Sequence, residues 1–218
     1  MKQKTLFLSA LAALILIFVA AAVFYSSQRA TQETQRIAAN EAALVRMHSP
    51  TLGRADAPVV IVEFFDPACE TCRVFYPMVK QLMATNPDRI RLVLRYAPFH
   101  NGSDKVVALI EASRKQGKFW PTLEALFGSQ EHWAAQHTPR VDLAWQHLDG
   151  LGLNLEQMAL DLTSPDIARV IEQDLADART LGVSQTPEFF VNGRPLPQFG
   201  FDQLRDLVNQ ELARTSGR

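Results

Sequence analysis

Cysteine is scarce in this chain, which has only two, Cys69 and Cys72, among 218 residues. A structural zinc site requires about four Cys or His ligands, and the five histidines, at positions 48, 100, 132, 137 and 147, show no close ligand spacing. A disulfide between residues so near in sequence would close a short loop and stabilise the fold little. Half of a metal site and two buried apolar residues remain as alternatives, but we favour a pair of reactive thiols.

An excess of charge of one sign is absent as well. Lys and Arg number 22, Asp and Glu number 23, and the formal net charge is −1. Without a broad basic field, a nucleic acid is not expected as a partner. The length of 218 residues suits one compact domain with an appendage.

The N-terminal run from Leu6 to Tyr25 has Ser9 as its only clearly polar member, and Lys2 and Lys4 precede it. At 1.5 Å per residue such a helix can span about 30 Å of hydrocarbon. Small residues at 20–22 suit a cleaved signal peptide, but the apolar region of a signal peptide is usually about 7–15 residues. We therefore expect residues 1–5 to be a cytoplasmic stub and residues 6–25 an uncleaved transmembrane signal-anchor. On either interpretation the rest of the chain is exported.

Residues 26–50 are polar, rich in Gln and Ala, and free of glycine. Ile37, Leu44 and His48 would share one helical face, but Glu41 interrupts that stripe. Because convincing coiled coils need three or four heptads, we interpret the segment as a partly helical linker rather than an oligomerising stalk.

The two cysteines directly follow an apolar run, residues 59–65, that is typical of a buried strand. If a helix begins near Cys69, its unpaired backbone N–H groups and its dipole favour the thiolate there. In such Cys-x-x-Cys sites the thiol pKa falls from about 8.5 to roughly 3.5–7.5, and the thiolate is the attacking species in disulfide exchange. Cys72, one turn along, could then resolve a mixed disulfide.

This segment resembles the active-site segment of the thioredoxin superfamily, and the chain is similar to DsbA-like thiol-disulfide oxidoreductases. Glu63, six residues before Cys69, matches the buried acid of the superfamily, and Pro77 matches the helix-kinking proline of many members. Residues 182–193, with Thr186 and Pro187, resemble the segment that supplies the cis-proline. The resemblance covers about residues 55–214.

The resemblance implies an α/β thioredoxin fold, with a central mixed sheet flanked by helices, over residues 51–218. A helical subdomain is expected as an insertion at about residues 103–181. In order along the chain, we expect a loop at 51–58, a strand at 59–65, a helix at 69–84 bent at Pro77, a strand at 90–97, helices at 103–117, 118–127, 141–148, 155–162 and 166–181, a strand and an Asn192-Gly193 hairpin, and a helix at 202–213.

The resemblance also implies roles for five residues. Cys69 would be the nucleophile, Cys72 the resolving thiol and Glu63 the proton relay, while Thr186 and Pro187 would form the loop that docks substrate. No bound cofactor or metal is required. The expected partners are thiols and disulfides of exported proteins, and a membrane or periplasmic redox partner that resets the pair.

Four other aromatic residues have simpler interpretations. Trp120, Trp133 and Trp145 are expected in the core, with a substrate groove as the alternative for one of them. His100 lies in a loop near the same sheet edge; it could touch the site, but we expect it to be exposed.

The direction of electron flow stays open. The dipeptide Glu70-Thr71 is neither the Pro-His of strongly oxidising DsbA proteins nor the Gly-Pro of thioredoxin. Glu70 should disfavour a neighbouring thiolate, which favours a milder oxidant, and Thr186 before the proline resembles reductase and isomerase members. The expected location is the bacterial inner membrane, single-pass, with the catalytic domain in the periplasm, or a secreted soluble form after cleavage. Two further functions remain as alternatives: Cu(I) handling by the two thiolates, and a chaperone or assembly factor on the same fold.

Overall fold

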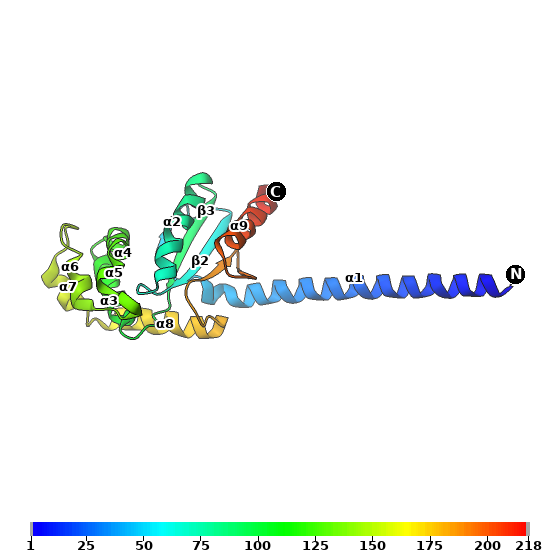
Figure 1. The fold of residues 1–218 in the computed structure, drawn as a ribbon, viewed down its shortest axis with the longest axis horizontal. Helices are drawn as coiled ribbons and strands as arrows, with labels where there is room; N and C mark the ends of the chain where they lie inside the picture. Colours follow the sequence, from blue (N-terminus) through cyan, green and yellow to red (C-terminus); the bar gives the residue numbers. More distant parts are fainter. Residues whose placement is uncertain (1, 217–218) are drawn as a thin grey trace. The chain divides into compact units, whose positions relative to one another are not determined.

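The computed structural model describes the backbone of residues 2–216, and their side chains except those of 2–13, 33–34, 36–39 and 216. These residues divide into two units between Glu41 and Ala42. The first unit contains most of helix α1 (Lys2–Leu44), and the second contains the last turn of α1 and all later elements (Figure 1).

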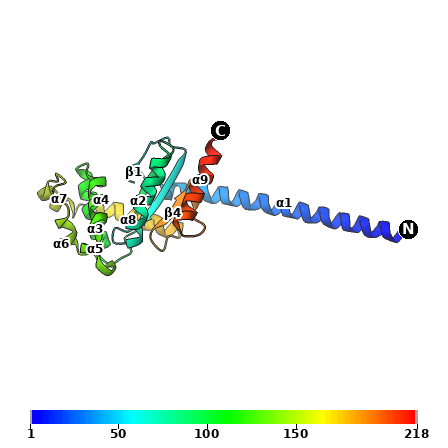
Figure 2. The same ribbon diagram turned by 45° about the horizontal axis from the view of Figure 1, so that its top comes forward.

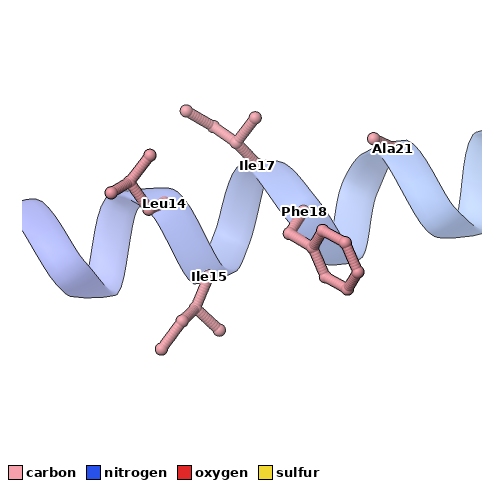
Figure 3. Close-up of a pocket in the computed structure, with 5 residues that line it drawn as sticks. All are labelled: Leu14, Ile15, Ile17, Phe18 and Ala21. Atoms are coloured by element: carbon pink, nitrogen blue, oxygen red, sulfur yellow. The ribbon is translucent and has the colours of Figure 1, made fainter.

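Helix α1 includes the segment Leu14–Gln32, which by length and composition could cross a membrane and has none of its window buried. A signal sequence would have the same properties. Figure 3 shows Leu14 and Ile17 on one side of the helix and Ile15 and Phe18 on the other. A helix that is apolar all round is typical of a membrane span.

Part of the expected pattern falls outside the described side chains. Lys2, Lys4, Ile37 and residues 6–13 of the apolar run belong to this part. The backbone is helical through the expected linker as far as Leu44.

One five-stranded sheet, in the order β1-β3-β2-β4-β5, forms the centre of the second unit. The pair β2 and β3 is parallel, from Val59 opposite Ile90 to Phe65 opposite Tyr96, and all other pairs are antiparallel. The strands are β1 (Thr51–Leu52), β2 (Val59–Phe65), β3 (Ile90–Tyr96), β4 (Glu188–Val191) and β5 (Arg194–Pro195). We expected a loop where the short strand β1 lies. A strand of two residues is too short to show an alternation of apolar and polar residues in the sequence.

The central strand β2 is apolar except at Glu63, because helices cover both faces of the sheet. Ile61 and Phe65 belong to the core cluster that includes α2 (Glu70–Thr85) and α9 (Phe201–Ser216). Val62 and Phe64 point to the opposite face, where Ala178 of α8 (Pro165–Leu181) joins their cluster. Helix α2 continues through Pro77, as expected.

Between β3 and α8 the chain forms a group of short helices, drawn in green in Figures 1 and 2. Trp133 is fully buried there, and its indole N–H donates to the carbonyl oxygen of Leu126 at 2.9 Å. Trp120 and Trp145 pack on the same core, so the three tryptophans are core residues, as predicted. The elements are α3 (Ser103–Lys115), α4 (Phe119–Gly128), α5 (Gln130–Trp133), η1 (Ala135–His137), α6 (Val141–Gln146) and α7 (Leu155–Asp161).

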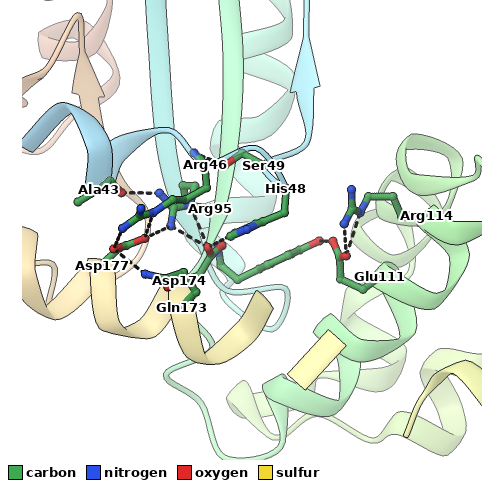
Figure 4. Close-up of polar contacts among 11 residues, drawn as sticks. Ala43, Arg46, His48, Ser49, Arg95, Glu111, Arg114, Gln173, Asp174 and Asp177 are labelled. Carbon is green, nitrogen blue, oxygen red and sulfur yellow. Dashed lines mark hydrogen bonds and ion pairs between the residues drawn. The ribbon is translucent and has the colours of Figure 1, made fainter. Parts of the chain in front are cut away.

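The face of the sheet that α8 covers contains a buried polar cluster (Figure 4). Arg95, with no exposed surface, donates to Asp174 at 2.7 Å and to Asp177 at 2.6 Å. Its guanidinium also donates to the carbonyl oxygen of Ala43. Arg46 donates to Asp177 at 2.6 Å. Burial raises the pKa of Asp177, but the hydrogen bonds from Arg46 and Arg95 outweigh it and leave this pKa lowered.

Residues 42–50, which we expected to be the end of the linker, therefore pack into the domain. Besides Arg46, His48 Nε2 lies 2.6 Å from Asp174 Oδ1, and Leu44 is buried. This packing was not predictable, because ion pairs between residues more than 120 positions apart leave no local periodicity.

Candidate dithiol active site

The turn between β2 and α2 positions the two thiols. The backbone N–H of Cys69 donates to the carbonyl oxygen of Asp66 at 3.0 Å, which closes a tight turn. Cys69 is the N-cap of α2, with extended φ and ψ of −79° and 117°, and its sulfur accepts the backbone N–H of Cys72 at 3.4 Å. Both thiols are free and buried. The expected start of the helix at the first cysteine is confirmed.

The surroundings of Cys69 favour its thiolate. A hydrogen bond with the Cys72 side chain contributes most and, against burial, lowers the pKa of Cys69 to about 6. The Thr186 side chain and the backbone N–H groups of Thr71 and Cys72 contribute in the same direction. At neutral pH Cys69 is therefore mostly a nucleophilic thiolate.

Cys72 has the opposite character. Burial raises the pKa of its thiol well above the ordinary value, and the hydrogen bond with Cys69 and the charge of Glu63 add to this. The two sulfurs are thus one ionised and one protonated group at neutral pH. Among the described residues, no group of three or more His, Cys, Asp or Glu side chains is arranged to hold a metal ion.

Glu63 lies on β2. Side chains alternate along a strand, so residues 61, 63 and 65 share the face that α2 covers, and residues 62 and 64 point to the other face. Its side chain is buried, and Oε2 has no hydrogen-bond partner. Burial, with a smaller effect of the Cys69 charge, raises the pKa of Glu63 to about 8. A carboxyl that titrates so near neutrality can both accept and release a proton in this apolar space.

The loop before β4 reaches the nucleophile from far along the chain. The Thr186–Pro187 peptide bond is cis, as the resemblance implied. Cys69 Sγ lies 3.3 Å from the carbonyl oxygen of Thr186. The structure therefore brings the five predicted residues into one site.

Sequence reasoning missed two residues of this site. Asp66, fully buried, accepts the backbone N–H groups of Ala68 at 2.8 Å and His100 at 2.9 Å. Gln130, on α5, donates through Nε2 to the carbonyl oxygens of Pro67 at 2.8 Å and Cys69 at 3.0 Å. Asp66 could have been noticed from its place in the motif, whereas nothing local marks Gln130.

Comparison with known proteins identifies the family. A family model described as thioredoxin matches residues 45–210. This chain belongs to the thioredoxin family. It is 32% identical to a thioredoxin-like oxidoreductase from Silicibacter pomeroyi DSS-3, with a TM-score of 0.67, over 78% of this chain and 94% of that one.

Two sequence relatives of this thioredoxin-family chain differ in length. The chain is 29% identical to a probable disulfide bond formation protein D of Bacillus cereus, over 75% of this chain and 79% of the relative. It is also 36% identical to a Na(+)/H(+) antiporter NhaA of Herminiimonas arsenicoxydans, over 66% of this chain but only 22% of that relative. The chain thus spans about a fifth of the antiporter's length.

These findings confirm the expected thioredoxin fold. The protein is an enzyme of the thiol-disulfide oxidoreductase class.

Proposed function

We propose that the Cys69–Cys72 pair carries out dithiol-disulfide exchange on exported proteins, with Cys69 as the attacking thiol. The observation that carries the proposal is the unequal pair, in which Cys69 has a pKa of about 6 and the pKa of Cys72 is raised. An inert structural pair has no need of such a difference.

In the reducing direction, the Cys69 thiolate bonds to one sulfur of a substrate disulfide and the other substrate sulfur leaves as a thiolate. Cys72, once deprotonated, bonds to the Cys69 sulfur and displaces the second substrate thiolate. The pair ends as a disulfide, and the substrate has gained two electrons. In the oxidising direction, a substrate thiolate attacks the enzyme disulfide, and the same steps run backward.

Glu63 would handle the proton of Cys72. The second step requires a thiolate from a buried thiol whose pKa is raised. The ionised fraction of the Glu63 carboxyl, on the neighbouring strand, can accept this proton without admitting bulk water, and its pKa of about 8 allows the proton to be returned.

Thr186 and Pro187 would dock the substrate. The carbonyl oxygen of Thr186 already contacts Cys69 Sγ, so a substrate backbone aligned along this loop would place its sulfur beside the nucleophile.

We infer that the enzyme is a moderate oxidant, that is, a disulfide donor. A stabilised thiolate favours the reduced enzyme and so makes its disulfide more oxidising. The Cys69 pKa of about 6 lies between the roughly 3.5 of DsbA and 7 of thioredoxin. The reduction potential should therefore lie between about −120 and −270 mV. The name of the Bacillus cereus relative supports this direction.

We also propose a periplasmic location with α1 as a membrane anchor. The apolar segment Leu14–Gln32 and the preceding lysines support it. A membrane or periplasmic redox partner would then reoxidise the pair.

The test is the equilibrium of the full-length protein in detergent with glutathione and dithiothreitol buffers. We expect a reversible Cys69–Cys72 disulfide, and loss of exchange with a disulfide-linked model peptide in Cys69→Ser. A Cys69→Ser protein that exchanges at the wild-type rate, or a pair that forms no reversible disulfide, would refute the proposal.

A further inference from the structure

A hollow of about 320 Å³ begins one residue beyond Cys72, between α2 and α4. We call it the Arg73 groove. Its wall on the α2 side starts in the first turn of the active-site helix, at the residue that directly follows Cys72. The residues that line it are Arg73, Tyr76, Pro77, Glu124, Phe127 and Gly128.

The middle of the groove is aromatic, and its far end is already neutralised. The rings of Tyr76 and Phe127 lie 5.5 Å apart and are mostly buried. Glu124 accepts hydrogen bonds from the Tyr76 hydroxyl at 3.0 Å and from Lys80 at 2.8 Å. The hydrogen bond from Lys80 is the main cause that lowers the pKa of Glu124. This carboxylate is thus engaged away from Arg73.

Arg73, at the end nearest the thiols, has no carboxylate partner among the described residues. Its Nε donates to Gln130 Oε1 at 3.1 Å. Gln130 is 1% exposed and also holds the carbonyl oxygen of Cys69. A buried amide therefore fixes the orientation of the guanidinium, and most of its five N–H donors remain for a ligand.

We propose that the Arg73 groove binds an extended substrate segment that carries an Asp or Glu close to its reactive cysteine. This inference rests on the proposed function and names the class of substrate. A pre-oriented, half-buried guanidinium pairs best with a carboxylate, and the apolar middle of the groove can cover a neighbouring side chain. Glu70 is exposed on the same first helical turn and repels acids on its own side. The acidic preference therefore applies to one flank of the substrate cysteine.

The test uses the full-length protein in detergent at low salt and a set of peptides. The single cysteine of each peptide is joined to a small thiol by a disulfide. Each peptide carries Glu, Gln or Lys at one position within four residues of its cysteine. The readout is the ratio of kcat/KM for the Glu and the Gln peptide, taken separately for each enzyme variant. At one position we expect the wild-type ratio to be about ten, since a hydrogen-bonded charge pair contributes that much.

Three variants decide the inference. Arg73→Gln should bring the ratio to about one, and Arg73→Glu should reverse the preference to Lys at the same position. Arg169→Glu makes the same charge change at an exposed position on α8 and should keep the wild-type ratio. The inference would be overturned if the wild-type ratio were about one at every position, as expected if the groove serves the redox partner instead. It would also be overturned if the preference for Glu survived in Arg73→Glu. Failure of the proposed function is distinguishable, because the Gln peptides would then show no Cys69-dependent exchange.

Discussion

Oδ2 of Asp66 lies 2.7 Å from Nδ1 of His100 and also accepts the backbone N–H of His100. The two residues stand on different loops, one before α2 and one before α3. Because Asp66 is buried and its carbonyl oxygen holds the N–H of Cys69, His100 fixes the turn that carries the nucleophile. The expectation of an exposed histidine was wrong, since only 28% of its side chain is exposed.

Removal of this link should raise the pKa of Cys69. In His100→Leu the carboxylate loses a donor, the turn loosens, and the backbone donors to the sulfur lose alignment. We expect the pKa to rise by about one unit, measured from thiolate absorbance against pH. His100→Asn keeps a donor near the place of Nδ1 and should restore most of the shift.

The matched control for this experiment is His132→Leu. His132 stacks on His147 at 5.7 Å, as His100 stacks on His137 at 4.8 Å, but no described contact joins it to the thiols. An equal rise in both Leu variants would mean a general loosening of the fold.

The reactivity of Cys69 should follow its low pKa. The rate of alkylation of the reduced protein should increase with pH, reach half its plateau near pH 6 and be flat above about pH 7.5. One label should be incorporated in this range, because the pKa of Cys72 is raised. Mass spectrometry locates the label, and a first label on Cys72 would contradict the assignment.

Cys72→Ser should trap the mixed disulfide. With the resolving thiol removed, Cys69 can still attack a substrate disulfide, but nothing inside the protein displaces the product. Non-reducing electrophoresis of the variant with a disulfide-linked peptide should show a stable covalent adduct, which Cys69→Ser lacks. Rapid turnover without an adduct would exclude Cys72 from this role.

Glu63 should destabilise the fold near neutral pH. The unfolded chain loses this proton near pH 4.5, whereas the native protein keeps it until about pH 8. The unfolded state therefore binds fewer protons, and stability falls as pH rises between these values. The free energy of unfolding of Glu63→Gln, measured relative to that of the wild type, should rise by about 3 kcal/mol between pH 4.5 and pH 7.5.

The measurement is urea unfolding of the oxidised proteins in detergent, since the oxidised thiols do not titrate. The same variant should resolve mixed disulfides more slowly. A stability difference that is constant with pH would show that Glu63 is ionised throughout.

Arg95 should be the most sensitive residue of the polar cluster. Arg95→Met leaves the buried Asp174 and Asp177 without their main counter-charge and should cost about 3–5 kcal/mol. Arg46→Met should cost less, about 1 kcal/mol, because the Arg46 side chain is 34% exposed. Urea unfolding in detergent measures both losses of stability. Equal losses would contradict the prediction that Arg95 contributes more than Arg46.

Local order in the chain made part of this structure predictable. The apolar strand at 59–65, the thiols that follow it and the Asn192-Gly193 turn each depend on neighbours in sequence, and all three lie where expected. Gly193 and Asn192 both have positive φ, as a two-residue hairpin turn requires.

The contacts that complete the site were not predictable in this way. Asp66 meets His100 across 34 positions, and Gln130 meets Cys69 across 61. Such pairs join single polar side chains on different elements, and they produce neither a periodicity nor a motif. For the same reason the domain begins at Ala42 in the structure rather than at residue 51.

The polar cluster also has a mechanical meaning. Any tension carried along the chain from α1 enters the domain at Ala43 and Arg46, which are bonded to Arg95 and Asp177. If residues 42–50 were pulled away from the domain, several short ion pairs would have to break together. These bonds join the segment to β3 and α8, on the sheet face opposite the one that α2 and Cys69 occupy.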